Sequence, residues 1–411
     1  MPVDSGDTAW LLVSSALVML MTPGVALFYG GMVRRKNVIS TIMMSFAILA
    51  MVGILWVLYG YSLAFGPDIG GIIGNLDWLG LRGVGQEPSS AYAQTVPHLA
   101  FMIFQAMFAI ITAALISGAV VERMKFRSLI IFSILWTTLV YVPVAHWVWG
   151  GGGWLAQLGA LDFAGGTVVH MNAGFSALAL AMALGPRKGF LEKETMAAHH
   201  LPMVMLGAAL LWFGWFGFNA GSALTAGGLA SSAFVATQIA AASAAFTWMI
   251  LSWMQRRPSL LGAATGAVAG LVAITPAAGF VPPLAGIPIG IGAAAVGYYF
   301  IAFRMRRSID ESLDVWAVHG MCGAWGALAT GIFASAAINA GGADGLLLGN
   351  ALQLAKQVAS VAIVAAYAFG VTWVLAKILK ASVGLRVREE EEMVGLDIAQ
   401  HGERAYGGIA E

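Results

Sequence analysis

The chain has 411 residues, of which 59% are hydrophobic and only 10% are charged, and its mean hydropathy is +0.83. Soluble proteins carry roughly 25% charged residues, so this composition excludes an ordinary soluble domain. The formal net charge of +1 excludes the basic surface of a nucleic-acid-binding protein. A single cysteine, Cys322, excludes an intrachain disulfide framework.

Apolar stretches follow one another along almost the whole chain. A membrane span needs about 20 apolar residues, and the sequence offers about eleven such stretches. They lie near residues 10–32, 38–65, 98–121, 128–149, 166–185, 199–218, 231–254, 260–275, 286–303, 315–336 and 350–379. The N-terminus carries Asp4 and Asp7 and no basic residue before the first stretch, which is unlike a cleavable signal peptide. We therefore predict an all-α integral membrane protein with eleven transmembrane helices.

Basic residues predict the orientation of these helices. The first, third, fifth, seventh and ninth loops hold Arg34-Arg35-Lys36, Arg123/Lys125/Arg127, Arg187/Lys188/Lys193, Arg256-Arg257 and Arg304/Arg306/Arg307. The even loops are nearly free of basic residues, and the residues after the last span are again basic. Because positive loops stay in the cytoplasm, we expect the N-terminus outside and the C-terminus inside, as an odd number of spans requires.

Two histidines lie inside predicted spans, His170 in the fifth and His319 in the tenth. An ionisable side chain at bilayer depth usually faces an internal pathway, and imidazole can exchange a proton near neutral pH. Each histidine follows a valine and, a few residues earlier, an acid, Asp162 or Asp314. Five spans separate the two histidines, so a second five-helix unit would insert upside down. This placement favours the inverted repeat of many transporters, with the site between the repeats.

Several segments closely resemble signatures of the ammonium transporter family (Amt/Mep/Rh). They are Asp162-Phe-Ala-Gly-Gly-Thr-Val-Val-His-Met-Asn-Ala-Gly174, Gly214-Trp-Phe-Gly-Phe-Asn-Ala-Gly-Ser222, Ala145-His-Trp-Val-Trp-Gly150 and Val315-Trp-Ala-Val-His-Gly320. The resemblance covers nearly the whole chain in order. The chain resembles the bacterial Amt branch rather than the Rh branch, because both Trp149 and Ser222 are present. Membership implies eleven helices and a homotrimer with one pore in each subunit.

The resemblance also implies roles for individual residues. Trp149, Phe108 and Ser222 would form an outer recruitment site for ammonium. Phe108 and Phe218 would stack as a gate beneath it, and Phe104, four residues before Phe108, shares its helix face. The chemistry of these side chains agrees with such roles. An indole face attracts a cation by about 0.5–2 kcal/mol, and a hydroxyl oxygen can accept a hydrogen bond from ammonium.

The residue types alone favour simpler interpretations. Trp149 is one of 14 tryptophans and could belong to the interfacial aromatic belt. The three phenylalanines could be ordinary helix-packing residues.

Below the gate we expect an apolar pore in which His170 and His319 lie side by side. Our hypothesis is that ammonium loses a proton near the gate and crosses as ammonia, while the proton follows through the histidines and makes transport electrogenic. Alternatively, the histidines only shape the lumen and donate hydrogen bonds to ammonia. Paired membrane histidines can also ligate haem, which would make this an electron-transfer protein.

Other polar residues are candidates for supporting roles. Asp162 lies eight residues before His170, about 12 Å along a helix, which is too far for direct pairing. It could fix the loop that contains Gly165 and Gly166, or stabilise a cation near the recruitment site. Asn219 and Thr275 border the expected outer vestibule. The remaining histidines, at 98, 146, 199 and 200, are expected to be packing or hydrogen-bonding groups rather than metal ligands.

The resemblance divides the chain into a transporter domain, residues 1–380, and a cytoplasmic tail, residues 381–411. The domain would contain repeats near 10–185 and 199–336 and a last helix at 350–379. By resemblance the tail packs beneath the trimer, and a PII-type signalling protein could bind the same face. We expect a non-enzymatic protein of the cytoplasmic (inner) membrane, in contact with lipid and without cofactor or metal. A sensor that acts through a partner with little flux is the alternative.

Overall fold

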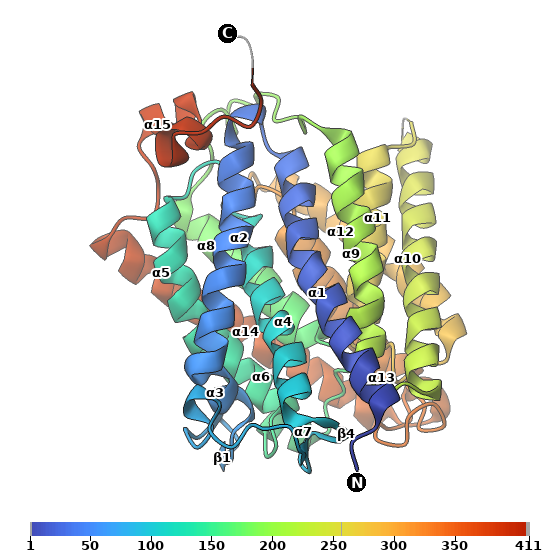
Figure 1. Ribbon diagram of the computed structural model, residues 1–411. Coiled ribbons are helices and arrows are strands. Elements are labelled where there is room, and N and C mark those ends of the chain that lie inside the picture. The colour runs from blue at the N-terminus through green and yellow to red at the C-terminus, as the bar shows by residue number, and fades with distance from the viewer. Residues whose placement is uncertain (1, 256, 408–411) are drawn as a thin grey trace.

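The computed structural model describes residues 2–255 and 257–407. Arg256, from the seventh predicted loop, and residues 408–411, from the predicted tail, lie outside the described residues. Figure 1 shows long helices that run roughly side by side, with the start of α1 and residues 385–407 at opposite ends of the bundle. We call the end beside the short strands the strand end, and the end that carries residues 385–407 the tail end.

The chain is built almost entirely from helices, several of them broken by a π-helical turn. The first half contains α1 (Ser5–Met32), α2 (Val38–Leu55), η2 (Trp56–Gly60), α3 (Tyr61–Phe65), α4 (His98–Ser117), α5 (Phe126–Trp136), η4 (Thr137–Tyr141), α6 (Val142–Trp149), α7 (Trp154–Leu158), η5 (Gly166–Met171) and α8 (Asn172–Leu184). The second half contains α9 (Leu201–Gly221), α10 (Gly228–Gln255), α11 (Leu260–Ile274), α12 (Gly286–Arg306), η7 (Trp316–Met321), α13 (Cys322–Phe333), α14 (Ala351–Ser382), α15 (Glu389–Val394) and η9 (Asp397–His401).

Within residues 2–255 and 257–407, strands occur only in the loop between α3 and α4. There β1 (Asp68–Ile69) pairs antiparallel with β2 (Ile73–Gly74), and β3 (Pro88–Ser89) pairs antiparallel with β4 (Ala93–Pro97).

Nine helical segments of the described chain are long and apolar enough to cross a membrane. The chain is therefore a multi-pass membrane protein, because a helix satisfies its own backbone hydrogen bonds in hydrocarbon. Every predicted span coincides with a helical segment to within a few residues. The two segments outside the nine are α11, which has 15 residues, and the broken helix formed by η7 and α13.

Both predicted pore histidines lie in π-helical turns that run directly into an α-helix. His170 belongs to η5, which continues into α8, and His319 belongs to η7, which continues into α13. A wider π turn is found frequently at functional sites because it changes the direction of a side chain without ending the helix.

A glycine contact allows these two broken helices to cross at close range. A Cβ atom added to Gly174 would lie 2.2 Å from the backbone nitrogen of Gly320 and 3.1 Å from the carbonyl carbon of His319. Even a methyl side chain would not fit into that space, so glycine is required at this position. The sequence therefore holds the two histidine-bearing backbones in direct contact.

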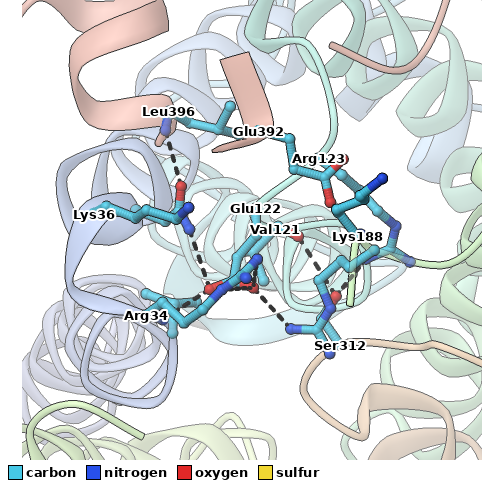
Figure 2. A network of polar contacts seen from close by, with 12 residues as sticks. Arg34, Lys36, Val121, Glu122, Arg123, Lys188, Ser312, Glu392 and Leu396 are labelled. Atoms are coloured by element: carbon cyan, nitrogen blue, oxygen red, sulfur yellow. Dashed lines mark hydrogen bonds and ion pairs between the residues drawn. The ribbon is translucent and has the colours of Figure 1, made fainter. Parts of the chain in front are cut away.

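A buried ionic network joins the loops at the tail end (Figure 2). The Glu122 carboxylate accepts hydrogen bonds from the backbone nitrogen of Arg34 at 2.7 Å, from the Asn37 amide at 3.2 Å and from the Arg187 guanidinium at 3.0 Å. Arg187 also pairs with Asp310 at 2.8 Å. Burial by itself raises the pKa of the Glu122 carboxyl, but the positive charges of Arg187 and Arg34 outweigh it, and the pKa falls below its ordinary value.

The tail docks onto the same network. The backbone nitrogen of Leu396 donates to Asn37 at 2.9 Å, and that of Lys188 donates to Glu392 at 2.6 Å. The Asp397 carboxylate accepts from the backbone nitrogen of Ser40 at 2.8 Å, in the first turn of α2. A carboxylate there satisfies a free N–H group and complements the helix dipole. The tail is thus attached through polar contacts that span several loops.

Replacing Glu122 by alanine should destabilise the protein by about 1–3 kcal/mol, because the buried donors of Asn37 and Arg187 lose an acceptor while Arg187 keeps its pair with Asp310. The heat-unfolding midpoint of the purified protein in detergent measures this. The lowered pKa means that the Glu122 contribution is present above the unfolded-state pKa and is lost as pH falls through the folded-state pKa. In the control, Glu389→Gln removes only the exposed pair with Lys188 and should change the midpoint little. Equal midpoints for the two variants would contradict the prediction.

Candidate functional site

A cavity of about 270 Å³ opens at the strand end, and its walls are mostly aromatic. It is lined by Phe65, Phe101, Phe104, Gln105, Phe108, Val148, Trp149, Phe163, Ser222 and Leu224. The three residues predicted for recruitment, Trp149, Phe108 and Ser222, therefore share one cavity although they come from α6, α4 and the residue after α9. Such a cavity offers aromatic faces to a cation together with the polar side chains of Gln105 and Ser222.

Hydrogen bonds fix the two polar members of this predicted set. The indole nitrogen of Trp149 donates to the backbone oxygen of Asp162 at 2.9 Å, which leaves the ring without a free N–H to oppose a cation. The Ser222 hydroxyl donates to the backbone oxygen of Phe218 at 2.9 Å. Its own oxygen can therefore accept a hydrogen bond from a donor in the cavity.

Stacked phenylalanines lie at the inner side of this cavity. The rings of Phe108 and Phe218 are stacked, with centroids 4.3 Å apart and an angle of 30° between their planes. Phe104 packs against Phe108 edge-on, with centroids 4.9 Å apart. All three rings are buried. The predicted shared face of Phe104 and Phe108 is thus present, and Phe218 meets it from α9.

The histidine pair continues from the stacked rings. The centroid of the His170 ring lies 5.8 Å from that of the Phe218 ring and 5.3 Å from that of the His319 ring. The planes of both neighbouring rings are roughly parallel to the His170 ring. The Nδ1 atoms of the two histidines are 3.2 Å apart, within hydrogen-bond distance. One ring must then donate and the other accept, and the protonation states of the two are coupled. Among the described residues, Nε2 of His170 has no hydrogen-bond partner.

This geometry does not fit the haem alternative. Two histidines that ligate a haem iron lie on opposite faces of the macrocycle, so with bonds of about 2 Å their ligating nitrogens are about 4 Å apart. The Nδ1 atoms are closer than that.

A second, smaller cavity of about 50 Å³ lies at the tail-end side of His319. Its walls include Tyr29 of α1, Asp314 before η7, Val318 and His319. Phe108, Phe218, His170 and His319 therefore form an unbroken series of contacts between the two cavities. The series is the shape expected of a narrow pore that is closed to water by its rings.

Asp162 caps the π-helical turn that carries His170. Its Oδ1 atom accepts from the backbone nitrogens of Gly165 at 2.8 Å and Gly166 at 2.7 Å. Its Oδ2 atom accepts from those of Thr167 at 2.8 Å and Val168 at 3.2 Å, and from the Thr167 hydroxyl. Burial raises the pKa of the Asp162 carboxyl above its ordinary value, and the hydrogen bonds from Thr167 and Gly165 only partly oppose it.

Thr275 and Asn219 are fully buried and are not among the residues that line the cavities. The Thr275 hydroxyl accepts from the indole nitrogen of Trp215 at 2.8 Å, and the Trp215 ring stacks on His170 with centroids 5.2 Å apart. The Asn219 amide donates to the Thr237 hydroxyl at 2.9 Å.

Trp215 and Tyr29 were not singled out from the sequence. Trp215 precedes Phe218 by three residues and so shares its helix face, which is a signal that could have identified it.

The remaining histidines make separate hydrogen bonds. His98 lies 2.6 Å from the Tyr61 hydroxyl, and His146 bridges the Ala64 carbonyl and Asp68. His199 contacts the Tyr406 hydroxyl at 2.8 Å, whereas the His200 ring accepts from the backbone of Met203. Across residues 2–255 and 257–407 there is no group of three or more His, Cys, Asp or Glu side chains that could hold a metal ion.

Comparisons with known proteins agree with this arrangement. Residues 9–406 match the Ammonium Transporter Family. An ammonium transporter of Bacillus subtilis (strain 168) is 52% identical over 98% of this chain and 99% of its own length. The crystal structure of Candida albicans Mep2 superposes with a TM-score of 0.90 at 37% identity, covering 98% of this chain and 90% of that chain.

A structure described as a sensor Amt protein superposes with a TM-score of 0.88 at 30% identity, covering 96% of this chain and 98% of that one. The family match extends over nearly the whole sequence and includes every residue of the two cavities and of the contact series between them. This chain therefore belongs to the ammonium transporter family.

Proposed function

We propose that the protein takes up ammonium selectively across the cytoplasmic membrane through the pore between the two cavities. The observation that carries this proposal is the contact series from the aromatic cavity through Phe108 and Phe218 to His170 and His319. It provides, in order, a cation-attracting site, a barrier to hydrated ions and a pair of proton-exchanging groups. Ammonium is the small cation that can use all three, because it donates hydrogen bonds and can lose a proton.

The membrane arrangement that accompanies this function has eleven crossings, with the N-terminus outside. The start of α1 and residues 385–407 lie at opposite ends of the bundle, which supports an odd number of crossings (Figure 1). The strand end is then external and the tail end cytoplasmic. An inverted repeat is supported by the two π-helical turns, η5 and η7, each of which carries one histidine of the pair. Residues 1–380 form the transporter domain in this proposal, and residues 381–411 form its cytoplasmic tail.

Recruitment begins at the strand-end cavity. An ammonium ion there is attracted by the faces of Trp149 and Phe108 and donates a hydrogen bond to the oxygen of Ser222, whose own proton is already engaged. Potassium matches ammonium in charge and approximate size but offers no N–H group. Discrimination between the two cations therefore depends on Ser222 and on the loss of a proton further along the pore.

To pass the phenylalanine rings, ammonium must lose its positive charge by giving up a proton. The buried rings of Phe108, Phe218 and Phe104 exclude water, which raises the free energy of a bare cation at that point. Ammonium gives up a proton, and neutral ammonia crosses the apolar region. The hydrogen bond between the Nδ1 atoms of His170 and His319 provides a route for the proton, so transport moves net charge.

Asp162, Thr275 and Asn219 support this pore without touching the substrate. The five hydrogen bonds to Asp162 favour its capping role over direct contact with a cation. Thr275 orients Trp215, which in turn stacks against His170. Asn219 ties α9, which carries Phe218, to Thr237 of α10.

Assembly and regulation follow from the surfaces. We propose a homotrimer embedded in lipid, supported by the family resemblance and by exposed apolar side chains on α9 and α10 such as Phe213 and Phe246. The tail end, where the tail covers the basic loops, is the surface on which a PII-type signalling protein would dock.

A second candidate function is ammonium sensing through a partner with little flux. The specific observation in its favour is the similarity to the sensor Amt structure.

Currents from proteoliposomes distinguish these proposals. A pulse of ammonium should evoke a saturable positive current, whereas equal pulses of potassium or sodium should not. Internal alkalinisation without current would mean that neutral ammonia passes and that the histidines only line its path. If ammonium evokes no current and no alkalinisation, the result would favour the sensor.

Removing both imidazoles, His170→Ala with His319→Ala, should abolish the ammonium current or its selectivity, because the proton route between the Nδ1 atoms disappears. The same proteoliposome assay measures this. His200→Ala is the control and should behave as the unaltered protein, because that ring accepts from the Met203 backbone and packs beside His199, away from the histidine pair. An unchanged, ammonium-selective current in the double variant would contradict the relay.

Trp149→Leu should weaken the apparent affinity for ammonium by about two- to thirty-fold, the equivalent of about 0.5–2 kcal/mol of cation–π attraction. Half-saturating concentrations for ammonium, with and without competing potassium, measure the effect. Trp253→Leu serves as the matched control, because that indole is 64% exposed and far along α10. Identical affinities in all three proteins would assign Trp149 to the aromatic belt.

A further inference from the structure

Glu311 occupies the position relative to His319 that Asp162 occupies relative to His170. Each acid lies eight residues before its histidine, and each accepts a backbone hydrogen bond at the beginning of the π-helical turn that carries it. The sequence pattern, an acid a few residues before each histidine, matches Asp162 with Asp314 instead. The structure pairs Asp314 with Arg304 at 2.6 Å, so Glu311 is the true counterpart.

The two capping carboxylates differ in how well their oxygens are satisfied. Both oxygens of Asp162 accept hydrogen bonds, as described above. Glu311 accepts through Oε2 from the backbone nitrogen of Trp316 at 3.1 Å. Its Oε1 atom has no partner among the described residues, although the side chain is fully buried. A buried, unpartnered carboxylate oxygen is costly unless it binds water or a proton.

Among the described residues, no Lys or Arg side chain forms an ion pair with Glu311. Arg304 of α12 donates to Asp314, and Arg187 donates to Asp310, while Arg123 binds Ser312 in the same loop. Burial raises the pKa of the Glu311 carboxyl to about 7; the charge of Arg304 lowers it and that of Asp314 raises it further. Glu311 therefore differs from the neighbouring acids Asp310 and Asp314, each of which is paired with an arginine.

The tail-end cavity lies between His319 and the loop that carries Glu311, because Leu313 and Asp314 of that loop line it, although Glu311 itself does not. His319, Tyr29 and Asp314 line it, and Tyr29 of α1 lies within electrostatic reach of Glu311. A water molecule needs roughly 10–15 Å³ of such space, so a cavity of about 50 Å³ has room for a few. A short chain of waters beside Tyr29 can thus join the His319 ring to the tail-end loop.

We propose that Glu311 is the proton acceptor at the cytoplasmic end of the pore. The proposal rests on the proposed function, in which a proton crosses the histidine pair. An N–H bond of protonated His319 breaks, and an O–H bond forms on the Glu311 carboxylate through the intervening water. Glu311 then releases the proton to cytoplasmic water and is again a carboxylate. No electron is transferred, and ammonia leaves separately.

The direction of the pH dependence follows from this role. Only the carboxylate can accept a proton, and it predominates above pH 7, near the pKa of about 7. The ammonium-evoked current, measured with equal pH on both sides of the membrane and with ammonium held constant, should rise between pH 6 and pH 8. Equal pH on both sides makes the result independent of the orientation in which the protein inserts.

Glu311→Gln tests the proposal, because glutamine keeps an oxygen for the Trp316 backbone but cannot accept a proton. In proteoliposomes of the full-length protein, we expect at least about a tenfold loss of current at pH 8 and no rise with pH. Alkalinisation by neutral ammonia should continue. Glu311→Asp, which can still titrate, should retain the rise with pH.

Each other outcome has a definite meaning. A Glu311→Gln current with the size and pH profile of the unaltered protein would overturn the proposal. Loss of both current and alkalinisation in Glu311→Gln and Glu311→Asp alike would make Glu311 a structural cap only, and would also overturn it. If the unaltered protein itself gives no ammonium current, the proposed electrogenic function fails, and that result is distinguishable from a failure specific to Glu311.

Discussion

The close crossing of η5–α8 with η7–α13 is the constraint on which the rest of the pore depends. Gly174 and Gly320 bring the two backbones into contact, and that contact sets the 3.2 Å separation of the histidine Nδ1 atoms. Trp215 and Phe218 stack against His170 from α9, so the position of the pair also decides where the phenylalanine stack must lie. Recruitment cavity, stacked rings and histidines are consequently one packed unit rather than independent sites.

Polar groups at both ends hold this apolar unit in place. In hydrocarbon, backbone N–H groups at the start of a broken helix need partners, and Asp162 supplies them for the helix of His170. The tail end uses charge instead: Glu122, Arg187 and Asp310 connect the loops after α4, α8 and α12. The tail binds to this network through Lys188 in the loop after α8 and through Asn37 in the segment between α1 and α2, which also contacts Glu122.

The two halves of the proposed pore differ in the acid that caps each broken helix and in the cavity at each end. Asp162, at the outer end, is fully engaged as a cap, whereas its counterpart Glu311 keeps one oxygen free. The outer cavity is large and aromatic, and the inner one is small and includes Tyr29 and Asp314. In the proposed function, this difference gives one cavity the means to attract a cation and places a proton acceptor near the other, although the two capping acids hold equivalent positions relative to their histidines.

Sequence alone determined the membrane class, the helical segments and the family, because hydropathy, loop charge and contiguous motifs are properties of neighbouring residues. It also identified His170, His319, Trp149 and the phenylalanines as candidates for the pore. Only the tertiary structure decided which acid corresponds to Asp162, that Thr275 acts through Trp215, and that Glu311 lacks a cation. Those facts depend on contacts between residues far apart in the chain, and local pattern carries no information about which distant partner satisfies a buried group.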